Sequence, residues 1–267
     1  MTPIANPGRS FDAWADEYDR YRPTYPAELF ALIRGELELP KRPAVVDMGA
    51  GTGRASLAMA ELGWRVTALE PGGAMLDVLR ANAANAGLVV ATVQASAEAT
   101  GLDPASVDLV TAAQAFHWFD KPAAVAEMAR ITRPGGGVAL FWNVRDETRS
   151  PFVAAYHAAL DRHGGPPEGR YLQAGRATGR PATRSALEDS VSFEAVTLHE
   201  LHHEVDMRAA DFLPMAFTAS YVRAMAAEAQ AAFRTETETL VAEHARPDGG
   251  LTIPYRIDCW IARRSTP

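Results

Sequence analysis

The chain has 267 residues, 48% of them hydrophobic and 22% charged, which is enough to bury one sizeable core of α/β type. Its formal net charge of -7 offers no broad cationic surface, so neither nucleic acid nor a membrane is expected as a partner. The single cysteine, Cys259, excludes an intrachain disulfide framework and a cysteine-rich zinc site. Because no leader-like or membrane-spanning apolar run is present, we expect a cytoplasmic protein. We expect it to be either a monomer or a homodimer.

The first predicted elements are two helices that precede the sheet. Apolar residues recur at three- and four-residue steps over residues 11–21, which predicts an amphipathic helix, and proline opens a second helix over about 26–38. The apolar face of the first helix must cover some other part of the protein. For Tyr18, Tyr21 and Arg22 two interpretations stay open, namely packing on the core and closing a ligand site.

The most informative stretch is the segment VVDMGAGTGR at residues 45–54. A buried parallel strand is predicted over 43–48 and a helix over 54–62, with a glycine at every second position of the turn between them. Glycines allow positive φ and let a ligand lie against the main chain, and the amides of the helix N-terminus favour an electronegative group. A dinucleotide fingerprint would need its third glycine where Arg54 stands. A tight turn without any ligand is the other alternative.

The spacing Asp-x-Gly-x-Gly-x-Gly over residues 47–53 resembles the first motif of the class I S-adenosylmethionine-dependent methyltransferases. In that family the turn wraps the amino-acid end of the cofactor. The resemblance therefore implies S-adenosylmethionine as the cofactor, with the following residues around it: Asp47, Gly49, Ala50, Gly51 and Gly53. The N-terminal segment also looks like the one that folds over the cofactor site in small-molecule methyltransferases, which implies Tyr18 and Arg22 at the cofactor and Tyr21 at the acceptor.

A second predicted strand, 64–70, ends in Glu70, 23 residues after Asp47 and close to the ~20 expected for a ribose-binding carboxylate. A carboxylate can accept from two vicinal hydroxyls at once, so we predict Glu70, followed by Pro71, at the ribose. An acid that only caps the next helix is the alternative. After a third strand at 88–93, the resembled family passes the adenine edge, commonly with Asp where this chain has Ser96. The resemblance thus implies Ser96 and the backbone of Ala97 at the adenine.

The fourth predicted strand, 107–113, delivers the segment QAFHWFD at 114–120 beyond its carboxyl end, where ligands bind in open α/β sheets. This segment looks like a motif of the trans-aconitate-methyltransferase-like, small-molecule branch, classed as methyltransferase type 11. The resemblance implies a role at the cofactor or the acceptor for several of its residues, which are Gln114 for the cofactor and Phe116, Trp118 and Phe119 for the acceptor.

His117 is the first choice for a catalytic base, because its unperturbed pKa is close to neutrality. A base would remove the proton of a hydroxyl or amine acceptor. A hydrogen-bonded histidine that shapes the loop is the alternative, and a carboxylate acceptor would need no base because it is already ionised.

The rest of the chain completes the sheet. A helix is predicted over 121–132, a glycine turn over 133–136 that resembles the last common motif of the family, and a strand over 138–143. A later strand, 191–205, is followed by two helices, one capped by Asp206 that runs to about 217 and a longer one capped by Ser220 that runs to about 244. A closing strand spans 251–262. The histidines at 199, 202 and 203 alternate between the faces of a strand, so no metal site is expected.

The chain thus divides into N-terminal helices over the cofactor site (1–40), an S-adenosylmethionine-binding core (41–145), a cap or lid insertion (146–190) and C-terminal elements (191–267) that complete the sheet and the acceptor pocket. Tyr221 is expected to line that pocket. Arginines at 170, 176, 180 and 184 of the insertion either hold a carboxylate or lie in a solvated loop.

The predicted fold is α/β, a Rossmann-like, mostly parallel seven-stranded sheet with helices on both faces and a helical cap. The predicted function is methyl transfer from S-adenosylmethionine to a small-molecule acceptor, with oxygen favoured over nitrogen as the acceptor atom. A nicotinamide-dependent oxidoreductase and a non-catalytic S-adenosylmethionine-binding regulator are the alternatives.

Overall fold

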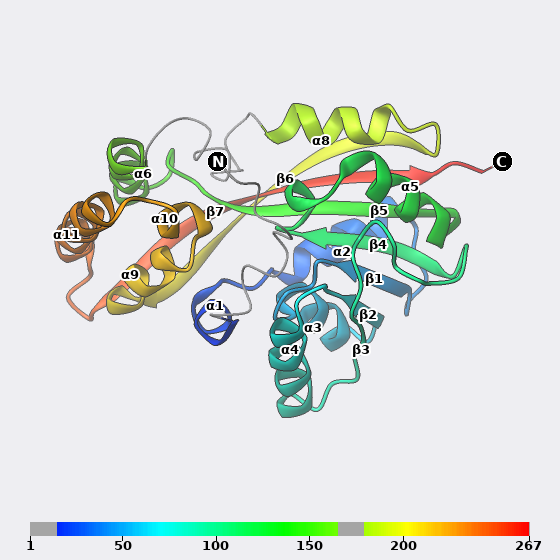
Figure 1. The fold of residues 1–267 in the computed structure, drawn as a ribbon, viewed down its shortest axis with the longest axis horizontal. Helices are drawn as coiled ribbons and strands as arrows, with labels where there is room; N and C mark the ends of the chain where they lie inside the picture. The colour runs from blue at the N-terminus through cyan, green and yellow to red at the C-terminus, as the bar shows by residue number, and fades with distance from the viewer. Residues whose placement is uncertain (1–14, 165–178, 267) are drawn as a thin grey trace.

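A computed structural model describes residues 15–164 and 179–266 (Figure 1). Its centre is a seven-stranded sheet with the order β3-β2-β1-β4-β5-β7-β6. The strands are β1 Ala44–Met48, β2 Arg65–Leu69, β3 Ala91–Val93, β4 Val107–Ala113, β5 Thr132–Arg145, β6 Phe193–Arg208 and β7 Gly250–Arg264. The first five pair in parallel, and β7 pairs antiparallel with both β5 and β6. The predicted Rossmann-like, mostly parallel seven-stranded sheet is therefore confirmed.

Helices cover both faces of this sheet and one of its ends (Figure 1). The N-terminal half contains α1 Ala15–Tyr21, α2 Ala27–Glu36, α3 Arg54–Glu61, α4 Gly73–Asn85, the 3-10 helix η3 Phe116–Trp118 and α5 Lys121–Ile131. The C-terminal half contains α6 Pro151–His163, α8 Gly179–Glu188, α9 Ala209–Phe217, α10 Ser220–Arg223 and α11 Ala227–His244.

Two of the three hydrophobic clusters lie against the two faces of the sheet. Neighbouring residues of a strand point to opposite faces, so Val45 packs with α2 and α3 while Val46 packs with α5 and α8. Both faces are covered, which explains why the central strands are apolar at nearly every position.

The third cluster lies beyond the sheet, at the left in Figure 1. The regular pairing of β4 with β5 ends at Phe141, whereas β5 continues to Arg145 alongside β7. Helices α6, α9, α10 and α11 pack around this extension through Tyr156, Phe212 and Phe233. The long strands thus carry a helical region past the carboxyl ends of the parallel strands.

Three local predictions differ from the structure. The glycines at 133–136 do not form a separate turn; they form a bulge inside β5, because Val107 pairs with Thr132 and Leu109 with Gly137. Asp206 does not cap a helix, since β6 continues to Arg208 through its pairing with β7. The single helix expected from Ser220 to His244 is two helices, α10 and α11. In each case strand pairing or packing between segments distant in the sequence decides the local structure. The local sequence pattern holds no information about these contacts.

Candidate active site

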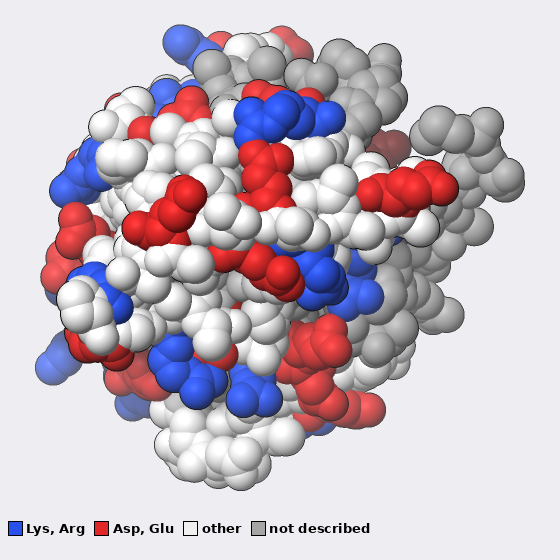
Figure 2. All heavy atoms as spheres, turned by 90° about the vertical axis from the view of Figure 1, so that its left-hand side faces the viewer, with Lys and Arg blue, Asp and Glu red and all other residues white. Residues whose placement is uncertain are grey.

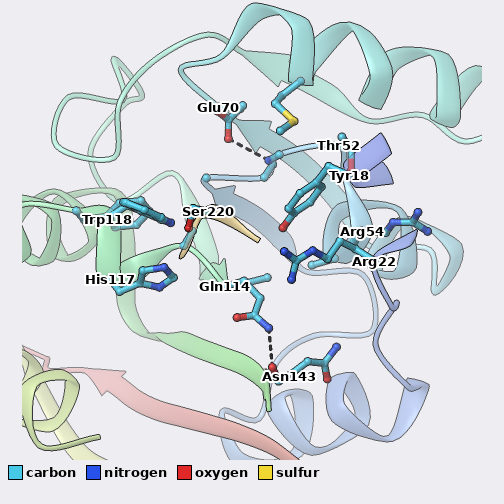
Figure 3. Close-up of a pocket in the computed structure, with 18 of the residues that line it drawn as sticks. Tyr18, Arg22, Thr52, Arg54, Glu70, Gln114, His117, Trp118, Asn143 and Ser220 are labelled. Atoms are coloured by element: carbon cyan, nitrogen blue, oxygen red, sulfur yellow. Dashed lines mark hydrogen bonds between the residues drawn. The ribbon is translucent and has the colours of Figure 1, made fainter. Parts of the chain in front are cut away.

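A cavity of about 360 Å³ opens at the carboxyl ends of β1, β2, β4 and β5. Residues of α1 and of α10 contribute to its walls, so it lies between the sheet and the helical region. Figure 3 shows Glu70 at one end, Asn143 at the other, and His117 and Trp118 facing Tyr18 and Arg22 across the space between them. Its volume is in the range of small-molecule sites.

The three glycines of the first turn serve two different purposes. All have positive φ, at +68° for Gly49, +56° for Gly51 and +92° for Gly53. A Cβ on Gly49 would come within 2.6 Å of Ala115 Cβ, and one on Gly53 within 2.7 Å of Leu79 Cγ. A Cβ on Gly51 would meet no atom within 4 Å, and this residue lines the cavity. Gly51 therefore keeps the site open, while the other two allow close packing.

Asp47 lies beneath the turn and does not line the cavity. Its carboxylate is fully buried and accepts hydrogen bonds from Ser56 Oγ at 2.6 Å and from Thr111 Oγ1 at 2.9 Å. Burial raises its pKa to about 6, although these two hydrogen bonds act in the opposite direction. Asp47 thus connects β1 to α3 and β4 and supports the turn from below.

Glu70 follows β2 and closes one side of the glycine turn. Its Oε2 accepts from the amide of Gly51 at 3.0 Å and its Oε1 from the amide of Gly72 at 2.9 Å. These bonds hold the carboxylate at the cavity wall. Three further predicted residues line the cavity near it, namely Pro71, Ser96 and Ala97.

The glycine turn also presents polar atoms that have no partner in the described part of the chain. Thr52 Oγ1 and Arg54 Nε are buried without a hydrogen bond there, and both residues line the cavity. Arg22 lies on the same side of the cavity (Figure 3), with its guanidinium 5.0 Å from the ring centre of Tyr18. Unmet polar groups at one place and a fixed carboxylate at Glu70 fit a ligand with a charged end and a diol.

The segment after β4 forms the next wall. Gln114 has a φ of +56°, unusual for a residue other than glycine, and its Nε2 donates to the carbonyl of Asn143 at 2.8 Å. Trp118 and Phe119 line the cavity as predicted from the sequence, whereas Phe116 is fully buried in the core and does not reach it.

His117 lines the cavity from η3 in a defined tautomer. Its Nδ1 accepts a hydrogen bond from Trp142 Nε1 at 3.3 Å, and because an indole nitrogen can only donate, the proton of the neutral imidazole is on Nε2. Burial, together with a smaller effect of the charge of Lys121, lowers the pKa of His117 to about 4. This differs from the near-neutral pKa on which its choice as a base rested. At neutral pH the ring is an uncharged hydrogen-bond donor.

The end of the cavity opposite Glu70 contains residues that the sequence did not single out. Tyr221 was predicted to line the cavity, and the wall at this end also includes Asn143, Arg145 and Tyr255. The first two follow the last apolar residues of a parallel strand, so the rule that ligands bind at carboxyl ends could have found them. Tyr255 comes from the antiparallel strand β7 and carries no such signal.

Some predicted residues lie elsewhere. Tyr21 faces a separate surface hollow formed with residues of α9 and α11. Of the insertion arginines, Arg180 binds Asp258 and Glu200, and Arg184 pairs with Glu188 at 2.7 Å. The arginines at 170 and 176 lie outside the described residues.

Charges are mixed on the end of the molecule formed by α6, α9 and α11, where Figure 2 shows acidic and basic side chains interspersed. Within residues 15–164 and 179–266, no group of three or more His, Cys, Asp or Glu side chains could hold a metal ion. In the same part of the chain, every helix is too short or too polar to cross a membrane.

A sheet of this order, with a glycine turn after β1 and an acid after β2, defines a class I methyltransferase fold. The sequence profile of the methyltransferase domain matches residues 46–140. An uncharacterized methyltransferase of Mycobacterium tuberculosis is 40% identical over 158 residues, which cover 59% of this chain and 61% of that protein. A second uncharacterized methyltransferase, from Schizosaccharomyces pombe, is 33% identical over 161 residues, covering 60% and 62%. The match thus spans about three-fifths of the length of these relatives.

Among solved structures, one described as a type II methyltransferase from Anaeromyxobacter dehalogenans superposes with a TM-score of 0.66 and 29% identity, over 92% of this chain and all of that one. Residues 46–140 thus form a methyltransferase domain, and the fold around them is that of the class I S-adenosylmethionine-dependent methyltransferases.

Proposed function

We propose that this protein binds S-adenosylmethionine between the glycine turn and Glu70 and transfers its methyl group to a small-molecule acceptor. The observation that supports this most directly is the pairing of Gly51 with Glu70. The amide of Gly51 holds the carboxylate in place at 3.0 Å, while the missing side chain leaves the space above it open. A packing turn would not need this combination.

We assign the parts of the cofactor to the residues that suit them chemically. Glu70 would accept hydrogen bonds from the two ribose hydroxyls, and Ser96 with the backbone of Ala97 would contact the adenine. The unmet donors of the turn, together with Arg22, would hold the charged amino-acid end. Tyr18 would cover this end from α1.

When bound, the cofactor supplies an electrophilic methyl group on a good leaving group, so the protein mainly has to align the acceptor and exclude water. Trp118 and Phe119 give an apolar wall for this purpose. His117 would donate from Nε2 to the acceptor and orient it. Its low pKa and its tautomer make it a poor group for removing a proton.

This role for His117 favours an acceptor atom that is nucleophilic without deprotonation. An ionised oxygen meets that condition, and an uncharged amine, whose proton can leave after transfer, is the second choice. We therefore favour O-methylation.

Calorimetry with S-adenosylhomocysteine and with nicotinamide dinucleotides tests the cofactor assignment. We expect saturable binding of the former and none of the latter, and the reverse result would show an oxidoreductase. Uptake of labelled methyl groups from S-adenosylmethionine by a metabolite panel tests the transfer. Tight cofactor binding without turnover on any acceptor would indicate a regulator instead of an enzyme.

A further inference from the structure

The segment from η3 to α5 is fastened at both of its ends. We call residues 117–119 the wall segment, because all three line the cavity. Before it, Phe116 is fully buried in the core. After it, the backbone amide of Asp120 donates a hydrogen bond to Oε1 of Glu98 at 3.0 Å. The bond to Glu98 therefore decides where this wall of the cavity ends.

Glu98 completes the cap at the start of α5. Asp120 is the N-cap residue, and its side chain accepts from the amide of Ala123 at 3.2 Å. In a complete capping box the third residue of the helix is Glu or Gln, whose side chain accepts from the amide of the N-cap residue. Here the third residue is Ala123, which cannot accept, so Glu98 supplies the acceptor from another segment. The first turn of α5 contains Lys121 and no acid, so Glu98 also adds a negative charge where a helix N-terminus favours one.

Glu98 belongs to the turn at which we place the adenine. Residues 96–99 form this turn, which is closed by a hydrogen bond from the amide of Ala99 to the carbonyl of Ser96 at 3.2 Å. The first three of these residues line the cavity. The amide of Thr100, the next residue, donates to Glu127 of α5 at 2.9 Å. The turn is thus attached to α5 at two points, and one of them is the end of the wall segment.

We infer that Glu98 is a positioning residue, which holds the wall segment through the amide of Asp120 and so connects the adenine end of the cavity with the wall that faces the methyl acceptor. This inference rests on the proposed function. Cofactor bound at Ser96 and Ala97 would stabilise the turn, and the turn would stabilise the wall segment through this hydrogen bond. Glu98 thus acts through Asp120 and does not contact the reacting atoms.

Hydrogen exchange, followed by mass spectrometry on the full chain, measures how firmly the wall segment is held. In the wild-type protein, we expect saturating S-adenosylhomocysteine to slow the exchange of the amides of residues 117–119 by about 5-fold, because the bound ligand and Glu98 together order this part of the site. A wild-type protein that binds S-adenosylhomocysteine without any slowing of the wall segment would overturn the inference.

Variants of Glu98 test whether the effect passes through its side chain. Glu98→Ala removes the acceptor, so most of the ligand-dependent slowing should be lost, while the affinity for S-adenosylhomocysteine should fall by no more than about 5-fold. Glu98→Gln keeps a side-chain oxygen that can accept a hydrogen bond, and it should retain the slowing. Equal slowing in a folded Glu98→Ala protein and in wild type would contradict the assignment.

The donor of the hydrogen bond can be removed separately. Asp120→Pro deletes the amide hydrogen and fits the backbone, because the φ of Asp120 is -67°, close to the ~-65° of proline, and Phe119 is extended at ψ 151°, which suits a residue before proline. Asp120→Ala is the matched control, since it loses the same capping side chain but keeps the amide. Asp120→Pro should lose the slowing, and Glu98→Ala should then have no further effect. In the Asp120→Ala background, Glu98→Ala should keep its effect.

The outcomes separate this inference from the proposed function. An effect of Glu98→Ala that is equally large in the Asp120→Ala and Asp120→Pro backgrounds would show direct contact of Glu98 with the ligand, against a positioning role. Failure of the wild-type protein to bind S-adenosylhomocysteine would refute the proposed function. The unliganded proteins would still test Glu98, because the wall segment should exchange faster in Glu98→Ala than in wild type. If Asp120→Pro does not fold, the comparison of Glu98→Ala with Glu98→Gln decides the question.

Discussion

The two ends of the cavity are built in different ways. The end near Glu70 comes from consecutive strand-to-helix turns, and its key contact joins Gly51 and Glu70, 19 residues apart. The opposite end combines Arg145 from β5, Tyr221 from α10 and Tyr255 from β7, which lie far apart in the sequence. The first end depends on backbone geometry, whereas the second depends on which side chains the long strands and the helical region present. We infer that the donor site tolerates little change and that the acceptor site determines specificity.

The largest expected effect tests the backbone of the donor end. Gly51→Val should abolish binding of S-adenosylhomocysteine, a loss of at least about 100-fold, because the new side chain would enter the cavity and its backbone would be strained at φ +56°. Calorimetry measures the loss. The matched control is Gly87→Val, which has a φ of +66° and open space around it but lies outside the cavity. Equal losses in the two variants would mean that strain alone, and no ligand site, explains the glycine.

The next effect concerns the carboxylate of Glu70. Glu70→Gln should weaken binding of S-adenosylhomocysteine by about 100-fold, because the amide loses charge-assisted bonds to the ribose and to two backbone amides. Asp77→Asn is the control, since Asp77 is an exposed acid paired with Arg80. An unchanged dissociation constant in a folded Glu70→Gln protein would remove Glu70 from the cofactor site.

The low pKa of His117 should make the stability of the folded protein depend on pH. Because the pKa of His117 in the folded protein, about 4, is below its ordinary value of 6.5, the unfolded state binds more protons between these values. Stability should therefore fall as the pH falls from 6.5 to 4, by on the order of 3 kcal/mol from this group. Denaturant unfolding of wild type and His117→Gln at several pH values isolates the contribution as their difference.

The pH dependence of kcat/KM tests whether His117 acts as a hydrogen-bond donor or as a base. With a pKa of about 4, His117 should produce no inflection in kcat/KM between pH 6 and 8. An inflection near pH 6.5 that disappears in His117→Gln would restore His117 as the catalytic base. Loss of cofactor binding in that variant, with normal turnover of the bound complex, would instead show a structural role.

The smallest expected effect is a gain in affinity for S-adenosylhomocysteine. In the resembled family an Asp commonly stands where this chain has Ser96, so Ser96→Asp should add a charged acceptor for the adenine amino group and tighten S-adenosylhomocysteine binding by several-fold, about 3 to 10. The analogue with hypoxanthine in place of adenine lacks this amino group and should gain nothing. Equal gains for both ligands would place Ser96 away from the adenine edge.

The donor end could be read from the sequence because its information is local. Glycine spacing, an acid at the next strand end and a loop after β4 occur in the right order, and parallel strands bring their carboxyl ends to one edge. The same reasoning placed Gly51, Glu70 and Trp118 at one cavity, as the structure does. It also predicted Asp47 at the cofactor, whereas in the structure Asp47 lies beneath the turn and binds Ser56 and Thr111.

The sequence by itself determined the fold class, the succession of strands and helices along the chain, and the presence of Gly51, Glu70 and Trp118 at one edge of the sheet. These follow from periodicity and from residues close together in the chain. Only the tertiary structure decided the protonation of His117, since its pKa depends mainly on burial and its tautomer on the hydrogen bond from Trp142 of β5. It also decided the composition of the acceptor end, where Arg145 is surrounded by tyrosines from three distant elements. The electrostatic environment of a side chain is a property of its neighbours in space, which no local pattern records.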